Sequence, residues 1–307
     1  MLPKVFIIIL NWNGIDDTLA CLESIKKLNV KDCGLGVIVV DNGSTDDSVE
    51  KLRKLVFREI DFRLVTTTTN LGFAGGNNVG IKYALESGAD YVMILNNDTI
   101  VDKNLITELL KVAKKEKVGA VSPKIYFAEG FEFHKDRYKK NELGKVVWYA
   151  GGKIDWKNVY GENRGVDEVD SGQFQNISNT GFATGACMFL SSQAIREVGM
   201  FDEKYFLYLE DADLSLRLKK KGWKVKYAPK AIVWHKVSQS SGIGSNLNDY
   251  FITRNRLMFG MKYAPIRARV ALIRESIKFM LVGRKWQKRG VSDFYGGKFG
   301  KGSFRNE

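Results

Sequence analysis

The sequence contains few cysteines and no long apolar run, and each of these features excludes a class of protein. Its 307 residues include three cysteines, which show neither the paired spacing of a disulfide framework nor that of a zinc site. The apolar run 5–10 is too short for a signal peptide, and no run of eighteen apolar residues occurs that could span a bilayer. We therefore expect a cytoplasmic protein, either free or peripheral on the inner face of the cell membrane.

Positive charge is unevenly distributed along the chain. The net charge is +13, but residues 262–307 alone hold twelve basic and three acidic residues, which leaves only +4 for the first 261 residues. A basic end on a nearly balanced body indicates an anionic partner, either nucleic acid or a membrane, unless that end is merely solvated. Because the body is balanced and carries no recognised nucleic-acid motif, no nucleic-acid partner is expected.

Apolar runs of strand length alternate with helical patterns through the first 120 residues. The runs 5–10, 37–40 and 91–95 are apolar on both faces, as in a buried and mainly parallel sheet. Helices are predicted between and after them, over residues 16–28, 44–57, 77–86 and 103–115. This alternation predicts an α/β fold with a doubly wound sheet, in which ligands bind at the carboxyl ends of the strands.

A polar cluster follows each of these apolar runs. Asp98 follows two asparagines after the third run, and Mg²⁺ or Mn²⁺ commonly takes one or two such carboxylates and completes its shell with phosphate oxygens. Asp41, after the second run, is a candidate acceptor for a nucleobase or ribose. For both residues the alternative is a turn that begins the next helix. The glycine-rich stretch 70–80 is a weaker candidate for phosphate or nucleoside contact, with Asn77 at the start of a helix.

Two further candidates lie in the second half of the chain. Glu210 and Asp211 precede a predicted helix over residues 212–221, and a helix N-terminus favours the ionised carboxylate that a general base requires. The alternative is an acidic helix cap. His235 ends the apolar run 231–234 and is one of two histidines, so it is either a packed residue or a metal ligand.

In this order the segments resemble glycosyltransferase family 2, in particular its rhamnosyltransferase-like members. The resemblance covers residues 5–259 and rests on nine short motifs, which begin at Leu10, Asp41, Asn70, Leu95, Thr184, Gly199, Glu210, Trp234 and Arg254. It implies a GT-A fold, with a mainly parallel central sheet and flanking helices. It also implies an inverting transfer of a sugar, rhamnose among the candidates, from a UDP- or dTDP-sugar. The acceptor would be a saccharide or a lipid-linked saccharide in cell-surface polysaccharide or glycan synthesis.

The resemblance also assigns roles to single residues, with Mn²⁺ or Mg²⁺ as cofactor. Asp98 would bind the metal with His235 as a second ligand, and Asp211 would be the catalytic base. The donor side would include Asn11, Asp41 at the nucleobase, Asn77, Asn97 near the ribose and Arg254 near the diphosphate, and the acceptor side Gly185, Ala186 and Glu210. Many relatives carry Asp-x-Asp where this chain has Asn96, so one carboxylate is missing, which lowers the expected metal affinity.

Two other functions are alternatives to a glycosyltransferase, a different class of enzyme and a non-enzymatic binding protein. A sugar-phosphate nucleotidyltransferase usually carries a glycine-rich, basic phosphate loop directly after the first strand, and the segment 11–14 has neither feature. A non-enzymatic nucleic-acid binder would account for the net charge, but the balanced body argues against it.

The chain is expected to divide into a catalytic domain over residues 1–262 and a basic amphipathic helix and tail over residues 263–307. Residues 126–179 read as a loop-rich insertion on the acceptor side. In the tail, Ile266, Val270, Ile273 and Ile277 share one face of a helix, with basic residues between them. That face is predicted to lie on an anionic membrane, with Trp286 at the headgroups, or to pack on the catalytic domain or a second subunit of a homodimer.

Overall fold

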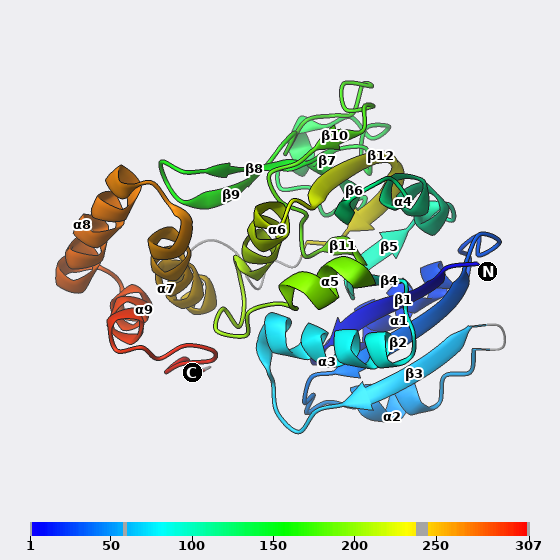
Figure 1. Ribbon diagram of the computed structural model, residues 1–307, viewed down its shortest axis with the longest axis horizontal. Coiled ribbons are helices and arrows are strands. Elements are labelled where there is room, and N and C mark those ends of the chain that lie inside the picture. Colours follow the sequence, from blue (N-terminus) through cyan, green and yellow to red (C-terminus); the bar gives the residue numbers. More distant parts are fainter. Residues whose placement is uncertain (1, 58–59, 238–244, 306–307) are drawn as a thin grey trace.

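A mixed sheet of ten strands forms the centre of the computed structural model, which describes residues 2–57, 60–237 and 245–305 (Figure 1). Its strands are β1 (Lys4–Asn11), β2 (Gly34–Asp41), β3 (Asp61–Thr66), β4 (Tyr91–Asn96), β5 (Thr99–Val101), β6 (Val118–Phe127), β7 (Val147–Tyr149), β10 (Ser178–Asn179), β11 (Cys187–Ser191) and β12 (Lys224–His235). The order is β10-β12-β6-β11-β4-β1-β2-β3, while β5 and β7 pair with β12 and β6. β3, β2, β1 and β4 are parallel neighbours, and β11 runs antiparallel between β4 and β6.

Helices surround this sheet, and a small hairpin stands apart from it. The helices are α1 (Ile15–Ile25), α2 (Ser48–Arg53), α3 (Gly72–Glu86), α4 (Leu105–Ala113), the single turn η1 (Lys135–Arg137), α5 (Ser192–Val198), α6 (Glu210–Lys220), α7 (Asn246–Tyr263), α8 (Ile266–Val282) and α9 (Lys285–Tyr295). The hairpin joins β8 (Gly152–Asp155) and β9 (Tyr160–Asn163). The α/β class and the mainly parallel arrangement of the first strands are as the sequence predicts.

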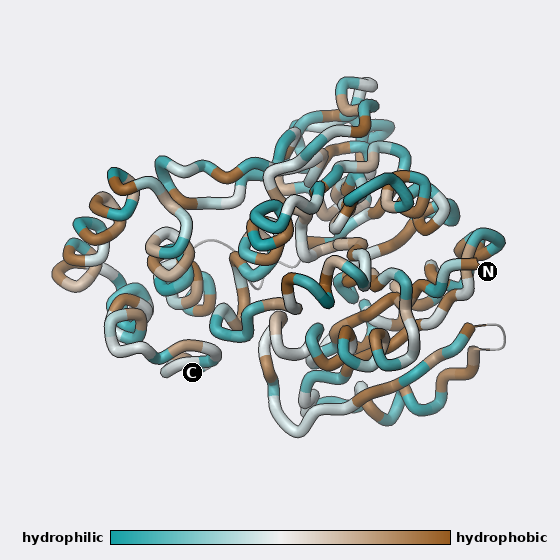
Figure 2. The backbone as a smooth tube through the Cα atoms, viewed as in Figure 1, coloured by the Kyte–Doolittle hydropathy of each residue, from teal (hydrophilic) through white to brown (hydrophobic). Residues whose placement is uncertain are grey.

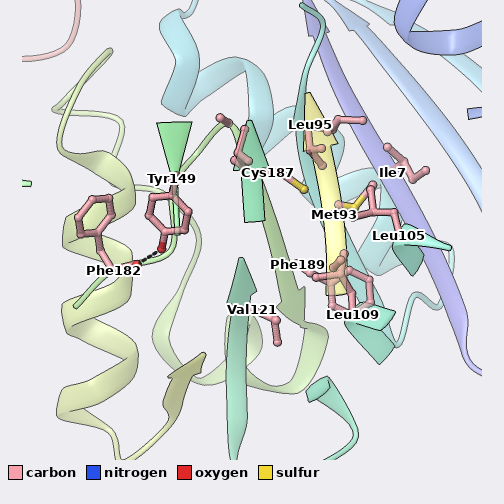
Figure 3. Close-up of a cluster of buried hydrophobic side chains, with 14 of the residues drawn as sticks. Ile7, Met93, Leu95, Leu105, Leu109, Val121, Tyr149, Phe182, Cys187 and Phe189 are labelled. Atoms are coloured by element: carbon pink, nitrogen blue, oxygen red, sulfur yellow. Dashed lines mark hydrogen bonds between the residues drawn. The ribbon is translucent and has the colours of Figure 1, made fainter. Parts of the chain in front are cut away.

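The sheet is buried on both faces, as its apolar strands require. Val5, Ile7 and Ile9 of β1 point into one hydrophobic cluster with residues of α1, α2 and α4. Phe6 and Ile8 point into a second cluster with residues of α3, α5 and α6. Successive side chains of a strand face opposite sides, so a strand covered on both faces must be apolar throughout. Figure 3 shows part of the first cluster, which includes Tyr149 and Phe182. The Tyr149 hydroxyl donates a hydrogen bond to the Phe182 carbonyl oxygen at 2.6 Å.

Two sequence expectations differ from the structure in their bounds. The glycine-rich stretch belongs to α3, which begins at Gly72, so Asn77 lies inside a helix and does not open one. A Cβ atom on Gly76 would lie 2.4 Å from a methyl carbon of Leu10, and one on Gly80 2.5 Å from Ile8. These glycines therefore let the helix approach β1 closely. The two strands expected near residues 223–227 and 231–235 are one strand, β12, with a register irregularity between Ala228 and Ile232.

The helices α7, α8 and α9 form a separate group at one end of the molecule (Figure 1), here called the C-terminal lobe. An aromatic cluster of Tyr250, Phe251, Trp286 and Phe304 joins this lobe to Phe206. Trp286 is therefore largely buried against its neighbours, and its expected position at membrane headgroups stays a prediction. No described helix is both long and apolar enough to cross a membrane. The domain boundary proposed at residue 262 falls at the end of α7 and stays a prediction.

Candidate functional site

A pocket of about 570 Å³ opens at the carboxyl ends of β1, β2 and β4, where the polar clusters of the sequence meet. The polar clusters lie together because the strands are parallel and in register, with Asn11 beside Asp41 and Leu10 beside Asn96. The strand ends contribute Trp12, Asn42, Asn97 and Asp98 to the pocket wall. The rest of the wall comes from the start of α3, from Phe206 and Leu207, and from the C-terminal lobe.

Asp41 lies below the pocket wall and holds the adjoining strand end and turn by hydrogen bonds. Its carboxylate accepts hydrogen bonds from the Asn11 side-chain amide at 2.8 Å and from the Ser44 backbone amide at 3.0 Å. Asp41 and Asn11 are buried, and neither lines the pocket. The next residue, Asn42, does line it. The role of Asp41 as a nucleobase contact stays a prediction, and what the geometry shows is a carboxylate that fixes the turn after β2.

Asn97 and Asp98 are held at the pocket by the turn after β4. The Asn97 side-chain amide donates hydrogen bonds to the Gly14 carbonyl oxygen at 3.2 Å and to the Thr18 hydroxyl at 3.0 Å. The Thr18 hydroxyl in turn donates to Asn11 at 2.8 Å. These bonds tie the end of β4 to the end of β1, so the Asn97–Asp98 pair has a fixed position.

His235 lies against Asp98 although 137 residues separate them in the chain. The Nε2 atom of His235 lies 3.0 Å from a carboxylate oxygen of Asp98, because β12 pairs with β5 directly after the Asp98 turn. The backbone amide of Lys236 also donates to the Asp98 carbonyl oxygen at 2.9 Å. The Trp148 ring contacts the imidazole edge-on, with ring centres 4.8 Å apart.

Asp98 and His235 could supply two of the ligands of a divalent cation. The Asp98 carboxylate oxygen and the His235 imidazole nitrogen lie 3.0 Å apart, Asp98 lines the pocket, and both atom types are ligands of divalent metals. No group of three or more histidine, cysteine or acidic side chains that could hold a metal occurs in the described part of the chain. The remaining ligand positions would therefore fall to phosphate oxygens and water, as is common for Mg²⁺.

Asp211 lies at the first turn of α6 and faces the backbone of the segment 184–186. Its carboxylate accepts hydrogen bonds from the backbone amides of Gly185 at 2.9 Å and of Ala212 at 2.7 Å. A Cβ atom on Gly185 would lie 3.0 Å from the ring of Phe73, which lines the pocket. The same Cβ would lie 3.7 Å from the Cβ atom of Asp211, so Asp211 and the Phe73 ring lie on the same side of Gly185.

Burial raises the pKa values of both carboxyls at the start of α6. It raises the pKa of Asp211 above its ordinary value, although the amides of Gly185 and Ala212 act in the opposite direction. Burial and then the charge of Asp211 raise the pKa of Glu210 well above its ordinary value. A carboxylate whose pKa is raised binds a proton more strongly, which suits a general base.

The chain enters α6 through a strained turn. Phe206, Tyr208 and Leu209 have φ values of 63°, 73° and 71°, which residues other than glycine rarely adopt. The Asn255 side-chain amide holds this turn by donating to the carbonyl oxygens of Tyr205, Leu207 and Tyr208 at 2.7–3.0 Å. The turn carries Phe206 and Leu207 of the pocket wall at one end and Asp211 just beyond the other. Asn255 therefore connects α7 to the position of Asp211.

Arg254 takes part in the same anchor and does not reach the pocket. It is fully buried, and its guanidinium donates to the carbonyl oxygens of Lys204, Tyr205 and Gly300 at 2.7–3.2 Å. The structure thus does not bring Arg254 to the pocket where a diphosphate contact was expected. Asn77 is absent from the pocket wall as well. It is buried in α3, and its side-chain amide donates to the Phe73 carbonyl oxygen at 2.9 Å.

Asp213 joins α6 to the end of α7. Its buried carboxylate accepts hydrogen bonds from Arg217 and Lys262 at 2.7 Å and from the Tyr263 hydroxyl at 2.8 Å. Burial acts to raise the pKa of Asp213, but Lys262 and Arg217 outweigh it and hold the pKa below its ordinary value. This carboxylate stabilises the junction behind Asp211.

Sequence reasoning missed several residues of the pocket wall, three of which suit a nucleotide. Lys301 and Arg305 bring positive charge to it from the end of the chain, and Trp12, 42% exposed, brings an aromatic face from the end of β1. Trp12 could have been noticed, since it lies inside the first motif of the resemblance. No local pattern marks Lys301 or Arg305, because their position depends on how the C-terminal lobe folds back.

Comparison with known proteins adds a family and a fold. The model of the family "Glycosyl transferase family 2" matches residues 6–199. An N-acetylglucosaminyl-diphospho-decaprenol L-rhamnosyltransferase of Mycobacterium tuberculosis is 29% identical over 221 residues, which is 68% of each chain. A low-salt glycan biosynthesis hexosyltransferase of Haloferax volcanii is 26% identical over 72% of this chain and 63% of its own. A mannosyltransferase of Pyrobaculum calidifontis, solved with GDP-Man and Mn²⁺, has a TM-score of 0.57 at 16% identity, over 99% of this chain and 77% of its own.

Proposed function

Because this chain belongs to glycosyltransferase family 2, we propose that it transfers a sugar, with inversion, from a nucleoside-diphosphate donor to a saccharide or lipid-linked acceptor. The reaction would serve the synthesis of a cell-surface polysaccharide or glycan. The observation that carries the proposal is the Asp98–His235 pair at a 570 Å³ pocket, with Asp211 held at Gly185 beside Phe73 of the pocket wall. Family membership leaves the nucleotidyltransferase and the non-enzymatic nucleic-acid binder without support.

The donor would lie in the pocket with its base toward the end of β1. Trp12 offers a partly exposed aromatic face at the pocket wall, and a nucleobase gains about 1–3 kcal/mol by stacking on such a face. Asn97 is on the same wall and would meet the ribose. A UDP- or a dTDP-sugar fits these contacts equally, since both carry a pyrimidine.

The metal would be Mn²⁺ or Mg²⁺, held by Asp98 and His235. When bound, it would neutralise charge on the diphosphate, which is the leaving group. The donor-atom set of the pair supports this assignment, and so does the Mn²⁺ bound in the related P. calidifontis fold. Lys301 and Arg305 also line the pocket and add two positive charges that would face the departing diphosphate in place of the expected Arg254.

Asp211 would act as the base in a single displacement. Its carboxylate takes the proton from the acceptor hydroxyl, the hydroxyl oxygen bonds to the anomeric carbon, and the bond from that carbon to the diphosphate oxygen breaks. Attack from the face opposite the leaving group inverts the configuration. The backbone of Gly185 and Ala186, together with buried Glu210, would border the acceptor.

The acceptor class is proposed from the relatives. The M. tuberculosis relative acts, by its name, on a sugar carried by diphospho-decaprenol, a lipid. A lipid-linked acceptor requires the enzyme to work at a membrane surface, so we infer a cytoplasmic protein that is peripheral on the inner face of the cell membrane. Residues 126–179, with the short strands β7 to β10, are proposed as the acceptor-side insertion.

A donor panel tests the proposal directly. UDP-, dTDP- and GDP-sugars, including dTDP-rhamnose, are each incubated with the full chain, Mn²⁺ and a polyprenyl-diphosphate-linked sugar, and released nucleotide is measured. We expect acceptor-dependent release from one pyrimidine-nucleotide sugar and none after chelation of the metal. Absence of release from every donor, or undiminished release in chelator, would contradict the proposal.

A further inference from the structure

The helix α8 packs on α7 with one face and leaves its apolar face uncovered. Ala268, Leu272 and Ser276 form the buried face, and α8 contacts α7 and α9. Large apolar side chains that are 42–77% exposed run along the other side and form what we call the α8 ridge: Ile266, Val270, Ile273, Ile277, Met280 and Leu281. Hydrophobic residues recur along this outermost helix in Figure 2. The stripe expected from the sequence therefore does not pack on the catalytic domain.

Positive charges flank the α8 ridge without balancing carboxylates. Arg267, Arg274 and Lys278 are exposed on α8, and no acidic side chain pairs with them in the part of the chain that the structure describes. Glu275, the acidic residue within α8, instead pairs with Arg256 of α7 at 3.1 Å. The helix thus combines an uncovered apolar face with cations on its borders.

A basic hollow of about 780 Å³ lies at the end of the ridge. Among the residues that the structure describes, its wall includes five cations, Lys285, Lys288, Arg289, Lys298 and Arg305, and no aspartate or glutamate, although Arg289 also pairs with the buried Asp293 at 3.9 Å. Met280 of the ridge forms part of the same wall, so apolar and basic surfaces are continuous there. Arg305 also lines the donor pocket, which places the hollow next to the candidate site.

We propose that the α8 ridge and the basic hollow together form a docking surface for an anionic lipid bilayer. An interfacial helix buries its apolar face at the boundary between headgroups and acyl chains and keeps its cations among anionic headgroups. The 17 residues of α8 span about 25 Å, and because the ridge runs along this length the helix would lie in the membrane plane while the hollow receives a headgroup phosphate. This surface lies outside the machinery of transfer and goes beyond the proposed reaction.

Charge favours a bilayer over a second copy of the chain as the occupant. In a two-fold dimer the same patch meets itself, so each residue on one copy faces the matching patch on the other. Here that would bring the cations of α8 and of the hollow against one another. An anionic membrane instead offers anionic headgroups to these cations and an apolar layer to the ridge.

Vesicle binding by the full chain tests the surface. Truncation is unsuitable, because Trp286 and Phe304 complete the aromatic cluster of the fold. Co-sedimentation is measured with vesicles of phosphatidylcholine alone and with added phosphatidylglycerol, for the wild type, for Ile277→Ser/Leu281→Ser and for Lys288→Glu/Lys298→Glu. We expect salt-sensitive binding that prefers the anionic vesicles, a loss of at least about tenfold in the ridge variant, and about 25-fold in the charge variant.

Matched controls separate docking from folding and from catalysis. Val56→Ser, at a side chain that is 75% exposed between α2 and β3, and Lys115→Glu, at an exposed lysine after α4, should bind as the wild type does. Asp98→Ala should keep full vesicle binding, and the docking variants should keep nucleotide release with a water-soluble acceptor. Equal binding by all variants would overturn the proposal. So would a dimer in light scattering that the ridge variant dissociates while no chain binds vesicles.

Discussion

Asp98 and Asp211 are the two carboxylates of the proposed reaction, and different parts of the structure hold them. Asp98 follows a buried strand and is fixed by the adjoining strand ends, through Asn97, Thr18 and the pairing of β5 with β12. Asp211 follows a strained turn whose carbonyl groups are held by Asn255, from a helix that begins 35 residues later. The position of the proposed metal ligand therefore depends on the sheet, and that of the proposed base depends on the docking of α7.

The largest expected effect is the loss of Asp98. Asp98→Ala removes the one carboxylate of the proposed metal pair, so we expect turnover to be abolished while the protein stays folded. Nucleotide release and circular dichroism measure the two outcomes. Turnover near the wild-type rate in buffer treated with EDTA would contradict the assignment of Asp98.

Asp211→Asn comes next. Removal of a general base typically costs about a hundredfold to ten-thousandfold in rate, so we expect kcat to fall by at least a hundredfold. Binding of the donor should change little, because Asp211 contacts the backbone of Gly185 and does not line the pocket. Steady-state kinetics with a calorimetric donor titration separates the two, and a lost donor affinity would move Asp211 to the nucleotide site.

Asn255→Ala sharpens the comparison, because it keeps both carboxylates and removes only the side chain that holds the turn before Asp211. We expect kcat to fall by about a hundredfold, the scale of a 1 Å misplacement of a reacting group, with unchanged metal dependence and donor affinity. Asn246→Ala, at an exposed position of the same helix, is the matched control and should keep full activity. Equal losses in kcat and in metal-dependent donor binding would indicate general unfolding and not a displaced base.

Trp12→Ala changes the proposed nucleotide contacts in the pocket that Asp98 lines and leaves the surroundings of Asp211 unchanged. Loss of one stacking contact should weaken binding of UDP or dTDP by about fivefold to a hundredfold, with kcat at saturating donor little changed. Trp12→Phe keeps an aromatic face and should retain most of the affinity. Calorimetry with each nucleotide checks both variants, and an unchanged Kd in Trp12→Ala would remove the stacking assignment.

The smallest expected effect is a shift in the pH profile. As the proposed base, Asp211 would act only when deprotonated, and burial raises its pKa, so activity should fall as the pH drops through a value above the ordinary 3.8 of an aspartate. A wild-type profile of kcat/KM against pH shows this acid limb. The control is Trp12→Phe, in which the limb should keep its position. A limb at or below the ordinary value would contradict the raised pKa.

The sequence predicts the Asp98 half of the comparison far better than the Asp211 half. β1, β2 and β4 are apolar on both faces, so their runs and the polar residues after them are visible as local patterns. β3 lies at the sheet edge, is mostly partly exposed and was not predicted. Asp211 was found by resemblance, but its support from Asn255 depends on a contact between distant segments.

The positions of the basic residues were also not predictable from the sequence, because they depend on contacts between distant segments. Arg254 carries a charge that suits a diphosphate, yet it is buried among carbonyl groups, and burial cannot be read from one side chain. Lys301 and Arg305 reach the pocket only because the chain after α9 turns back past Gly300, whose amide donates to the Lys204 carbonyl oxygen. The stripe on α8 was predicted from its spacing, but only the packed structure shows that it faces outward.

A binding titration of UDP and of dTDP, with and without Mn²⁺, tests the central claim that the two carboxylates have separate tasks. The wild type, Asp98→Ala and Asp211→Asn are compared by calorimetry on the same preparations used for turnover. The account predicts that Mn²⁺ strengthens nucleotide binding in the wild type and in Asp211→Asn but not in Asp98→Ala, although both variants have lost turnover. A Mn²⁺ effect that survives in Asp98→Ala, or disappears in Asp211→Asn, would contradict it.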